Sequence, residues 1–230
     1  MKYDFSKLWS AQFFAFYKFK HFFEYASDKD SQINYYKQFI AIHADMNGIS
    51  KIETPQEMID YYFEENESVL EMIKNQFIVF LFTRYEFIIQ DTMKCLICDS
   101  PERIIKFIKV YPDYEEYIGF SLKEFIKCES KEEYITIISE RLSLKILSGK
   151  PSKVIERFKC LVKTEKINTT TLDELMIKRN NIVHEGQVYK IGLDELETYY
   201  ETIEDLLKVL ALALKNINIP VIDPGYILTE

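Results

Sequence analysis

The chain has 230 residues, 47% of them hydrophobic and 29% charged, which is typical of a globular protein with a sizeable core. Its 6 glycines and 6 prolines are too few for a fibrous, loop-rich or disordered protein. The formal charge of −8 argues against a general nucleic-acid binder, because a net negative protein repels phosphate.

The chain also lacks the usual signs of export or membrane insertion. Its first residues do not have the pattern of a signal peptide, and the longest apolar run, 77–82, is far shorter than the roughly 20 residues that span a bilayer. The cysteines at 95, 98, 128 and 160 do not make a disulfide framework. We therefore expect a cytoplasmic protein with no membrane partner.

Helix signals recur along almost the whole chain, so the predicted fold class is all-α. Capping-box spacing occurs at Thr54–Glu57 (with Pro55 between), Ser68–Glu71, Ser121–Glu124, Ser130–Glu133 and Thr171–Glu174. Gly149 and Gly186 stand where helices would end in a left-handed residue. Together with apolar residues at helical spacing, these signals predict helices over 4–26, 31–46, 55–66, 68–98, 101–110, 121–128, 131–148, 151–164, 171–185 and 194–216. An extended tail is expected after Pro220.

The first predicted helix, 4–26, is unusually rich in aromatic residues. The rings are those of Phe5, Trp9, Phe13, Phe14, Phe16, Tyr17, Phe19, Phe22, Phe23 and Tyr25. They lie on more than one face of the helix, which indicates burial in the core and against a partner subunit. Core packing alone is the plainer interpretation, and nothing in the spacing requires a base-stacking platform.

The sequence offers few residues for metal or cofactor chemistry. His21 and His43 have no metal-ligating companion at helical spacing, so we interpret them as structural. Cys95 and Cys98 form a C-x-x-C inside an apolar helical stretch without a second pair, which favours buried thiols over a zinc or redox site. Glycine-rich phosphate loops are also absent. We expect no metal and no cofactor.

The strongest candidate site is the stretch from Lys178 to Gly186, at the end of a predicted helix. Asn180 and His184 are four residues apart and share one helix face, with Arg179 beside them. Histidine exchanges protons near neutral pH, and arginine holds phosphate oxygens with a fixed fork of donors. Asparagine can orient a phosphate, a ribose hydroxyl or the imidazole. The set suits phosphodiester chemistry, although an Arg-Asn helix end with a solvated histidine is the purely structural alternative.

Charge is unevenly distributed around this candidate site. Residues 141–166 contain eight bases and two acids, whereas 53–71 contains seven acids and no base. A basic stretch before the motif helix would guide RNA toward it, so Lys163 and Lys166 join Lys178 and Asn181 as weaker substrate-binding candidates. Ordinary solvated helix faces are the alternative explanation for such runs.

The run Arg179-Asn180-Asn181-Ile182-Val183-His184 resembles the R-N-x-x-x-H motif of the HEPN superfamily of all-α ribonucleases. The segment 80–91 resembles the long helix of the RiboL-PSP-type group, in which an aromatic-Glu pair recurs. The resemblance covers about residues 55–216. It implies an antiparallel helical bundle over 51–219. The first 50 residues lie outside the resemblance, and we expect their aromatic-rich helices to pack on the bundle, with an extended tail over 220–230.

The resemblance also implies a function. Such proteins are metal-independent endoribonucleases that work as homodimers, with the two motifs facing each other in a composite cleft. Arg179, Asn180 and His184 would be the catalytic residues, and products would carry a 2′,3′-cyclic phosphate and a 5′-hydroxyl. Toxin or anti-phage roles, with an antitoxin or defence partner protein, are typical of the group. Gly186 replaces a tyrosine that some toxins carry two residues after the histidine, which disfavours control by modification at that position.

Two other functions remain open from the sequence. In the first, the chain is a non-catalytic HEPN-like module that binds RNA, a nucleotide or a protein without cleavage. In the second, it is a structural interaction protein whose aromatic first helix docks a partner.

Overall fold

The structure is a computed structural model that describes residues 2–48, 56–118, 122–223, 225 and 227–228. Over these ranges the chain forms α1 (Phe5–Ser27), α2 (Lys29–Met46), α3 (Gln56–Asp99), α4 (Glu102–Val110), the 3₁₀ helix η1 (Pro112–Ile118), α5 (Leu122–Lys127), α6 (Lys131–Ile146), α7 (Pro151–Lys159), α8 (Thr169–Glu185) and α9 (Leu193–Asn216). The predicted all-α class is confirmed.

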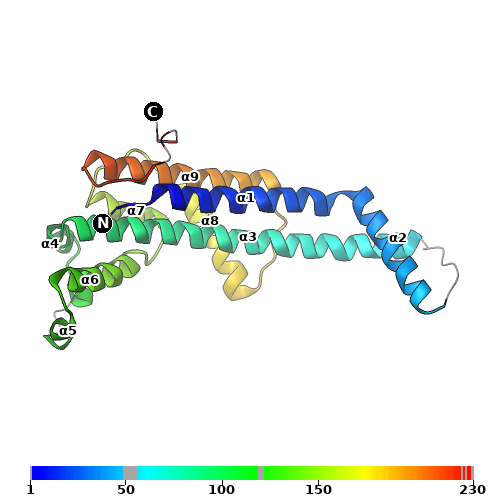
Figure 1. The fold of residues 1–230 in the computed structure, drawn as a ribbon, viewed down its shortest axis with the longest axis horizontal. Helices are drawn as coiled ribbons and strands as arrows, with labels where there is room; N and C mark the ends of the chain where they lie inside the picture. The colour runs from blue at the N-terminus through cyan, green and yellow to red at the C-terminus, as the bar shows by residue number, and fades with distance from the viewer. Residues whose placement is uncertain (1, 49–55, 119–121, 224, 226, 229–230) are drawn as a thin grey trace.

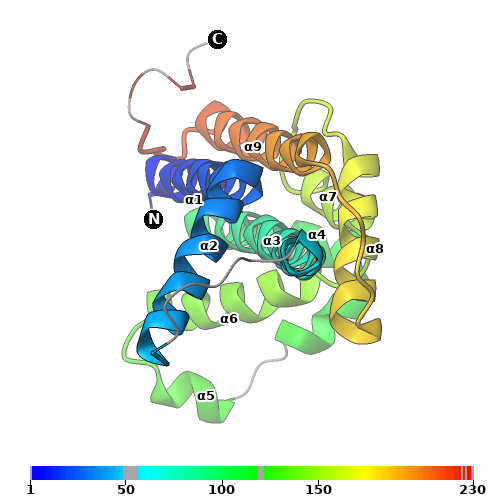
Figure 2. The ribbon, with the colours of Figure 1, turned by 90° about the vertical axis from the view of Figure 1, so that its right-hand side faces the viewer.

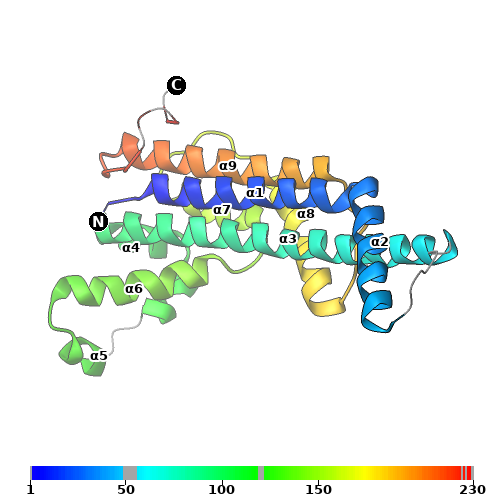
Figure 3. The same cartoon turned by 45° about the vertical axis from the view of Figure 1, so that its right-hand side comes forward.

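Helix α3 is the centre of the arrangement. It contacts α1, α2, α4, α6, α8 and α9. Figure 3 shows α9, α1, α3 and α6 stacked in that order. In Figure 2, α8 runs crosswise beside α3 and α9, both of which it contacts. The crossing brings the last part of α8 against the middle of α3, which is where the candidate site forms.

One continuous α3 replaces the two helices predicted over 55–66 and 68–98. It runs for 44 residues, and Ser68 lies exposed inside it instead of capping a new helix. Packing on both sides of the expected break explains the continuity. Tyr62 stacks on Tyr36 of α2 at 4.4 Å between ring centroids, and Ile59 and Leu70 are both buried. The expected cap Thr54–Pro55 and the domain boundary at residues 50–51 lie outside the described residues.

The ends of the other helices test the remaining predicted caps. Glu133 N–H donates to Ser130 Oγ at 3.1 Å, so this cap is confirmed. At α8 the cap is Asn168, whose side chain accepts from Thr171 N–H, so the predicted cap at Thr171 lies inside the helix. The predicted cap at Ser121 falls outside the described residues. The 3₁₀ helix η1 is an element that the apolar spacing did not predict.

The aromatic helix α1 is buried along one face only. Phe16 stacks on Tyr200 of α9 at 4.2 Å, and Phe19 stacks on Phe77 of α3 at 3.9 Å. On the outer side, several rings are exposed by 43 to 72%: Phe14, Tyr17, Phe22 and Tyr25. Helix α1 therefore belongs to the core and also leaves a second aromatic face uncovered within the described chain.

The two ends of the described chain lie side by side, whereas α2 projects away from the bundle. Tyr3 N–H donates to the Pro220 carbonyl at 2.9 Å, and Ile222 N–H donates to the Tyr3 carbonyl at 2.8 Å. Figure 1 shows α2 and the first turns of α3 extending beyond α1 and α9 at the opposite end. Among the described helices, none is both long and apolar enough to cross a membrane.

Candidate functional site

The candidate site lies at the C-terminal end of α8. Leu172, Leu175 and Ile182 bury one face of this helix against the bundle. The helix ends at Gly186, whose φ of 65° is left-handed and whose N–H donates to the Asn181 carbonyl. This burial and this cap leave Asn180 half-buried on the opposite face and turn His184 toward solvent.

Arg179 is held against α3. Its guanidinium lies 5.7 Å from the centroid of the Phe82 ring, and its Nη1 donates to Asn180 Oδ1 at 3.0 Å. Its Nε is buried and makes no hydrogen bond within the described chain. Asn180 therefore orients the fork of Arg179.

His184 is exposed one turn further along the helix, as is its neighbour Val183. Because its imidazole is open to solvent, a bound substrate can reach it without any rearrangement of the core. The structure thus places Arg179, Asn180 and His184 together within the last two turns of α8. An arginine fork and an accessible imidazole are the donors that a phosphodiester requires.

Glu86 of α3 is a charged neighbour that the sequence did not single out as a site residue. Burial raises the pKa of its carboxyl above the usual range, and the positive charge of Arg179 partly offsets that rise. Glu86 also lines a cavity of about 430 Å³ between α3 and the end of α6. The aromatic-Glu pair Tyr85-Glu86 was the available signal, because it belongs to the motif-like segment quoted above.

Two of the weaker candidates, Lys178 and Asn181, are engaged in contacts inside the protein. Lys178 Nζ pairs with Glu195 of α9 and lies 5.5 Å from the centroid of the Tyr189 ring. Asn181 Nδ2 donates to the Tyr189 hydroxyl at 2.7 Å. Both side chains hold the segment between α8 and α9 in place.

The other two candidates, Lys163 and Lys166, are not brought to the motif. Both are exposed in the segment that precedes α8, whereas His184 lies in its last turn. At 1.5 Å per residue, Arg179 lies about 15 Å and His184 about 22 Å along α8 from its first residue, Thr169. Within one protomer these lysines therefore lie more than two helical turns from Arg179.

The cysteines and remaining histidines stand apart from this site. Cys95 is buried inside α3, where burial raises the pKa of its thiol to about 12. His21 and His43 lie exposed on α1 and α2. Over the ranges that the structure describes, no three histidine, cysteine, aspartate or glutamate side chains gather as metal ligands would.

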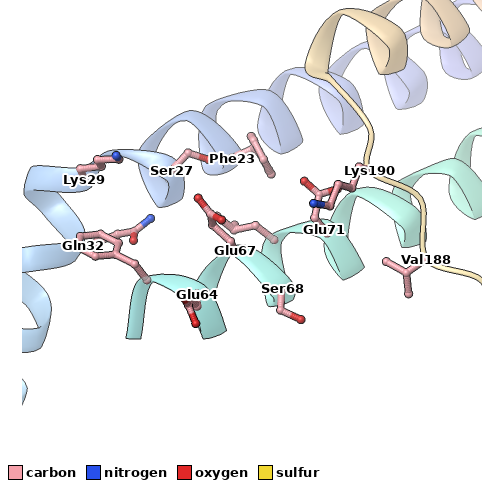
Figure 4. Close-up of a pocket in the computed structure, with 12 residues that line it drawn as sticks. Phe23, Ser27, Lys29, Gln32, Glu64, Glu67, Ser68, Glu71, Val188 and Lys190 are labelled. Atoms are coloured by element: carbon pink, nitrogen blue, oxygen red, sulfur yellow. The ribbon is translucent and has the colours of Figure 1, made fainter. Parts of the chain in front are cut away.

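A separate cavity of about 600 Å³ lies between α1, the start of α2, α3 and the segment after α8. Figure 4 shows Glu64 and Glu67 on its α3 wall, with Phe23 opposite and Val188 and Lys190 on the segment that closes one side. Because its carboxylates repel phosphate, this cavity does not suit RNA. The motif end of α8 is the better site.

Sequence reasoning missed the residues that support the motif from a distance. Asn75 and Glu71 of α3 bind the backbone of Tyr189 and Ile191. Asn75 and Tyr189 are separated by 114 residues in the chain, so no local pattern predicts their pairing. The one local signal was an asparagine placed two residues before the apolar run 77–82.

Comparison with known proteins identifies the family of the chain. The family model described as RiboL-PSP-HEPN matches residues 45–216, which is more than half of the chain. The chain therefore belongs to this HEPN-type family, and its all-α bundle is the fold that the resemblance implied. No curated protein and no solved structure matches the chain.

Proposed function

We propose that this chain is a metal-independent endoribonuclease of the HEPN type that works in the cytoplasm as a homodimer. The observation that carries the proposal is the position of Arg179 and His184 at the accessible end of α8. Arg179 is oriented by Asn180, while His184 faces solvent two residues before the helix is capped by Gly186. Membership of the RiboL-PSP-HEPN family supports the same chemistry.

In the proposed reaction, His184 removes the proton from a ribose 2′-hydroxyl. The 2′-oxygen then attacks the adjacent phosphorus, and the bond from phosphorus to the 5′-oxygen breaks. The leaving 5′-oxygen takes a proton from the imidazolium of the partner's His184, which leaves a 2′,3′-cyclic phosphate and a 5′-hydroxyl. The Arg179 guanidinium stabilises the negative charge that builds up on the non-bridging oxygens.

The biological role that we propose is that of a toxin or anti-phage effector restrained by a partner protein. RNA cleavage inside the cell would stop growth, and a partner would prevent this until a trigger arrives. Expression of the wild-type chain should then arrest growth, and Arg179→Ala or His184→Ala should relieve the arrest at equal protein levels. Equal toxicity of all three chains would contradict the catalytic assignment.

The experiment that tests the reaction is cleavage of purified RNA in EDTA. Wild type and His43→Ala should cleave, because His43 lies exposed on α2, away from the motif. His184→Ala should lose about 10²- to 10⁴-fold in rate, the usual contribution of a general acid or base. Binding of RNA without a cyclic-phosphate product would instead identify a non-catalytic binding module.

A second function is favoured by the outer face of α1. Phe14, Tyr17, Phe22 and Tyr25 are exposed, although large aromatic side chains gain most from burial. We propose that this face contacts another protein subunit. Replacing Phe14 and Tyr25 with serine should weaken that association and leave the helical content unchanged, as measured by analytical ultracentrifugation and circular dichroism.

A further inference from the structure

The segment that joins α8 to α9 is tied to α3 by a buried asparagine. Asn75 is 2% exposed, and its Oδ1 accepts from Tyr189 N–H at 2.9 Å. Its Nδ2 donates to the Tyr189 carbonyl at 2.8 Å. A single side chain thus binds both backbone groups of Tyr189, as a neighbouring strand would, and fixes that residue relative to α3.

A second tie lies two residues further along the same segment. Glu71 Oε2 accepts from Ile191 N–H at 3.2 Å, and Lys74 Nζ donates to the Ile191 carbonyl at 2.6 Å. Glu71 and Lys74 also pair with each other. Figure 4 shows Glu71 on α3 beside the segment that carries Val188 and Lys190. The segment is therefore anchored by one turn of α3 at two consecutive points.

The same segment reaches back to the motif through the Tyr189 side chain. The Tyr189 hydroxyl accepts from Asn181 Nδ2 at 2.7 Å and donates to Gln187 Oε1 at 3.0 Å. Asn181 precedes His184 by three residues, so the two share the last turn of α8. A chain of hydrogen bonds therefore runs from the rigid core helix α3, through Tyr189, into the turn that carries the imidazole.

We infer that Asn75 and Tyr189 are positioning residues for the R-N-x-x-x-H motif, an inference that rests on the ribonuclease function proposed above. Asn75 fixes the place of Tyr189, and the Tyr189 hydroxyl fixes Asn181. The last turn of α8 then holds His184 at a constant distance from Arg179, which packs on α3 independently. Because reaction rates depend steeply on the alignment of reacting groups, loss of these bonds lowers kcat more than substrate binding.

The kinetic test uses Tyr189→Phe, which keeps the ring but removes the hydroxyl that binds Asn181. We expect kcat to fall about 10-fold and KM to stay within about 2-fold. Asn75→Ala should have the larger effect, and Asn75→Asp should recover part of it because a carboxylate still accepts from Tyr189 N–H. The matched control is Thr92→Val on the same helix, which removes a buried hydrogen bond to Tyr3 and should leave kcat unchanged.

Amide hydrogen exchange supplies a readout that does not depend on activity. Asn75→Ala should accelerate exchange at residues 186–191 and in the last turn of α8, while the first turns of α8 stay protected. Thr92→Val should not change exchange in either place. Unchanged exchange in Asn75→Ala, or a wild-type kcat in Tyr189→Phe, would overturn the positioning role. Failure of RNA cleavage by the wild type would overturn the proposed function instead, and the exchange result would still decide whether Asn75 orders the motif turn.

Discussion

The two ends of helix α8 are built from the same helical physics but have different surroundings. At the first end, Asn168 caps the helix, and Asp173 in the first turns accepts from Ser152 N–H at 2.9 Å. At the last end, Gly186 caps the helix, and the following segment is bound by Asn75 of α3. Both ends are well anchored, so anchoring alone does not distinguish them.

The chemistry at the two ends does distinguish them. The last end brings Arg179 beside Glu86 of α3 and carries the exposed His184, whereas the first end offers the exposed lysines 163 and 166. About 15 Å of helix separates the first residue of α8 from Arg179, and about 22 Å separates it from His184. Basic residues that precede a motif in the sequence are therefore not neighbours of that motif in the fold, and the RNA site is expected at the last end only.

Among variants at the two ends of α8, the one that removes the arginine fork should have the largest effect on cleavage. Arg179→Ala should lower the rate of RNA cleavage by about 10²- to 10³-fold, because one donor to the developing charge is lost. Arg179→Lys should recover only part of the rate, since an ammonium cannot bind two oxygens in the fixed geometry of the fork. Steady-state cleavage assays measure both variants. A rate near wild type in Arg179→Ala would place the chemistry elsewhere.

The two caps allow a matched comparison of the helix ends. Gly186→Ala forces a left-handed φ of 65° on a residue with a Cβ, although no atom lies within 4 Å to clash with it. Asn168→Ala removes the side chain that accepts from Thr171 N–H. Each should lower the free energy of unfolding by about 1 kcal/mol in urea titrations.

The caps should nevertheless differ in their effect on cleavage. Only Gly186→Ala should reduce it, because only that cap belongs to the turn of His184. Equal losses of activity in Gly186→Ala and Asn168→Ala, at equal stability, would remove the distinction between the two ends.

Glu86 gives a smaller and pH-dependent effect at the motif end. Burial raises the pKa of its carboxyl in the folded state, so the ionised form opposes folding at pH values above that raised pKa. Glu86→Gln should therefore stabilise the protein at pH 7, by less than about 1 kcal/mol. The gain should shrink as the pH falls through the raised pKa toward the ordinary value of 4.5. Urea titrations at several pH values check this, and a variant that is less stable at pH 7 would contradict it.

The smallest effect is expected at the first end of α8. Lys163→Ala with Lys166→Ala should leave the cleavage rate within about 2-fold of wild type at physiological salt. The reason is that exposed charges more than one Debye length of about 8 Å from the phosphate are largely screened. Rates of this double variant at two salt concentrations test the point. A loss comparable to that of Arg179→Ala would show that RNA crosses the whole length of the helix.

Much of the fold could be predicted from local patterns. Apolar spacing and end signals such as Ser130 and Gly186 depend on residues within a few positions of each other, so the sequence contains them directly. The continuity of α3 through Ser68 could not be predicted this way. It depends on Tyr62 stacking on Tyr36 of another helix, and tertiary packing overrides a local capping signal.

The residues of the candidate site also fall into two groups, those that local spacing predicts and those that meet only through the fold. Arg179, Asn180 and His184 are close in the sequence and share one helix, so their spacing predicts that they meet. Asn75 meets Tyr189, and Glu86 lies beside Arg179, only because α8 folds across α3. Lys178 and Asn181 were predicted as substrate contacts from their position in the motif, yet the path of the segment after α8 gives them partners inside the protein.

Cleavage of an RNA oligonucleotide in EDTA, beside the same strand with a single 2′-deoxyribose at the cut site, tests the central claim most directly. The claim is that the motif end of α8 uses the neighbouring 2′-hydroxyl as the nucleophile, with His184 moving its proton. The all-ribose strand should be cut to a 2′,3′-cyclic phosphate and a 5′-hydroxyl, and the substituted strand should stay intact at that position. Cleavage of both strands, or undiminished cleavage of the RNA by His184→Ala, would contradict the claim.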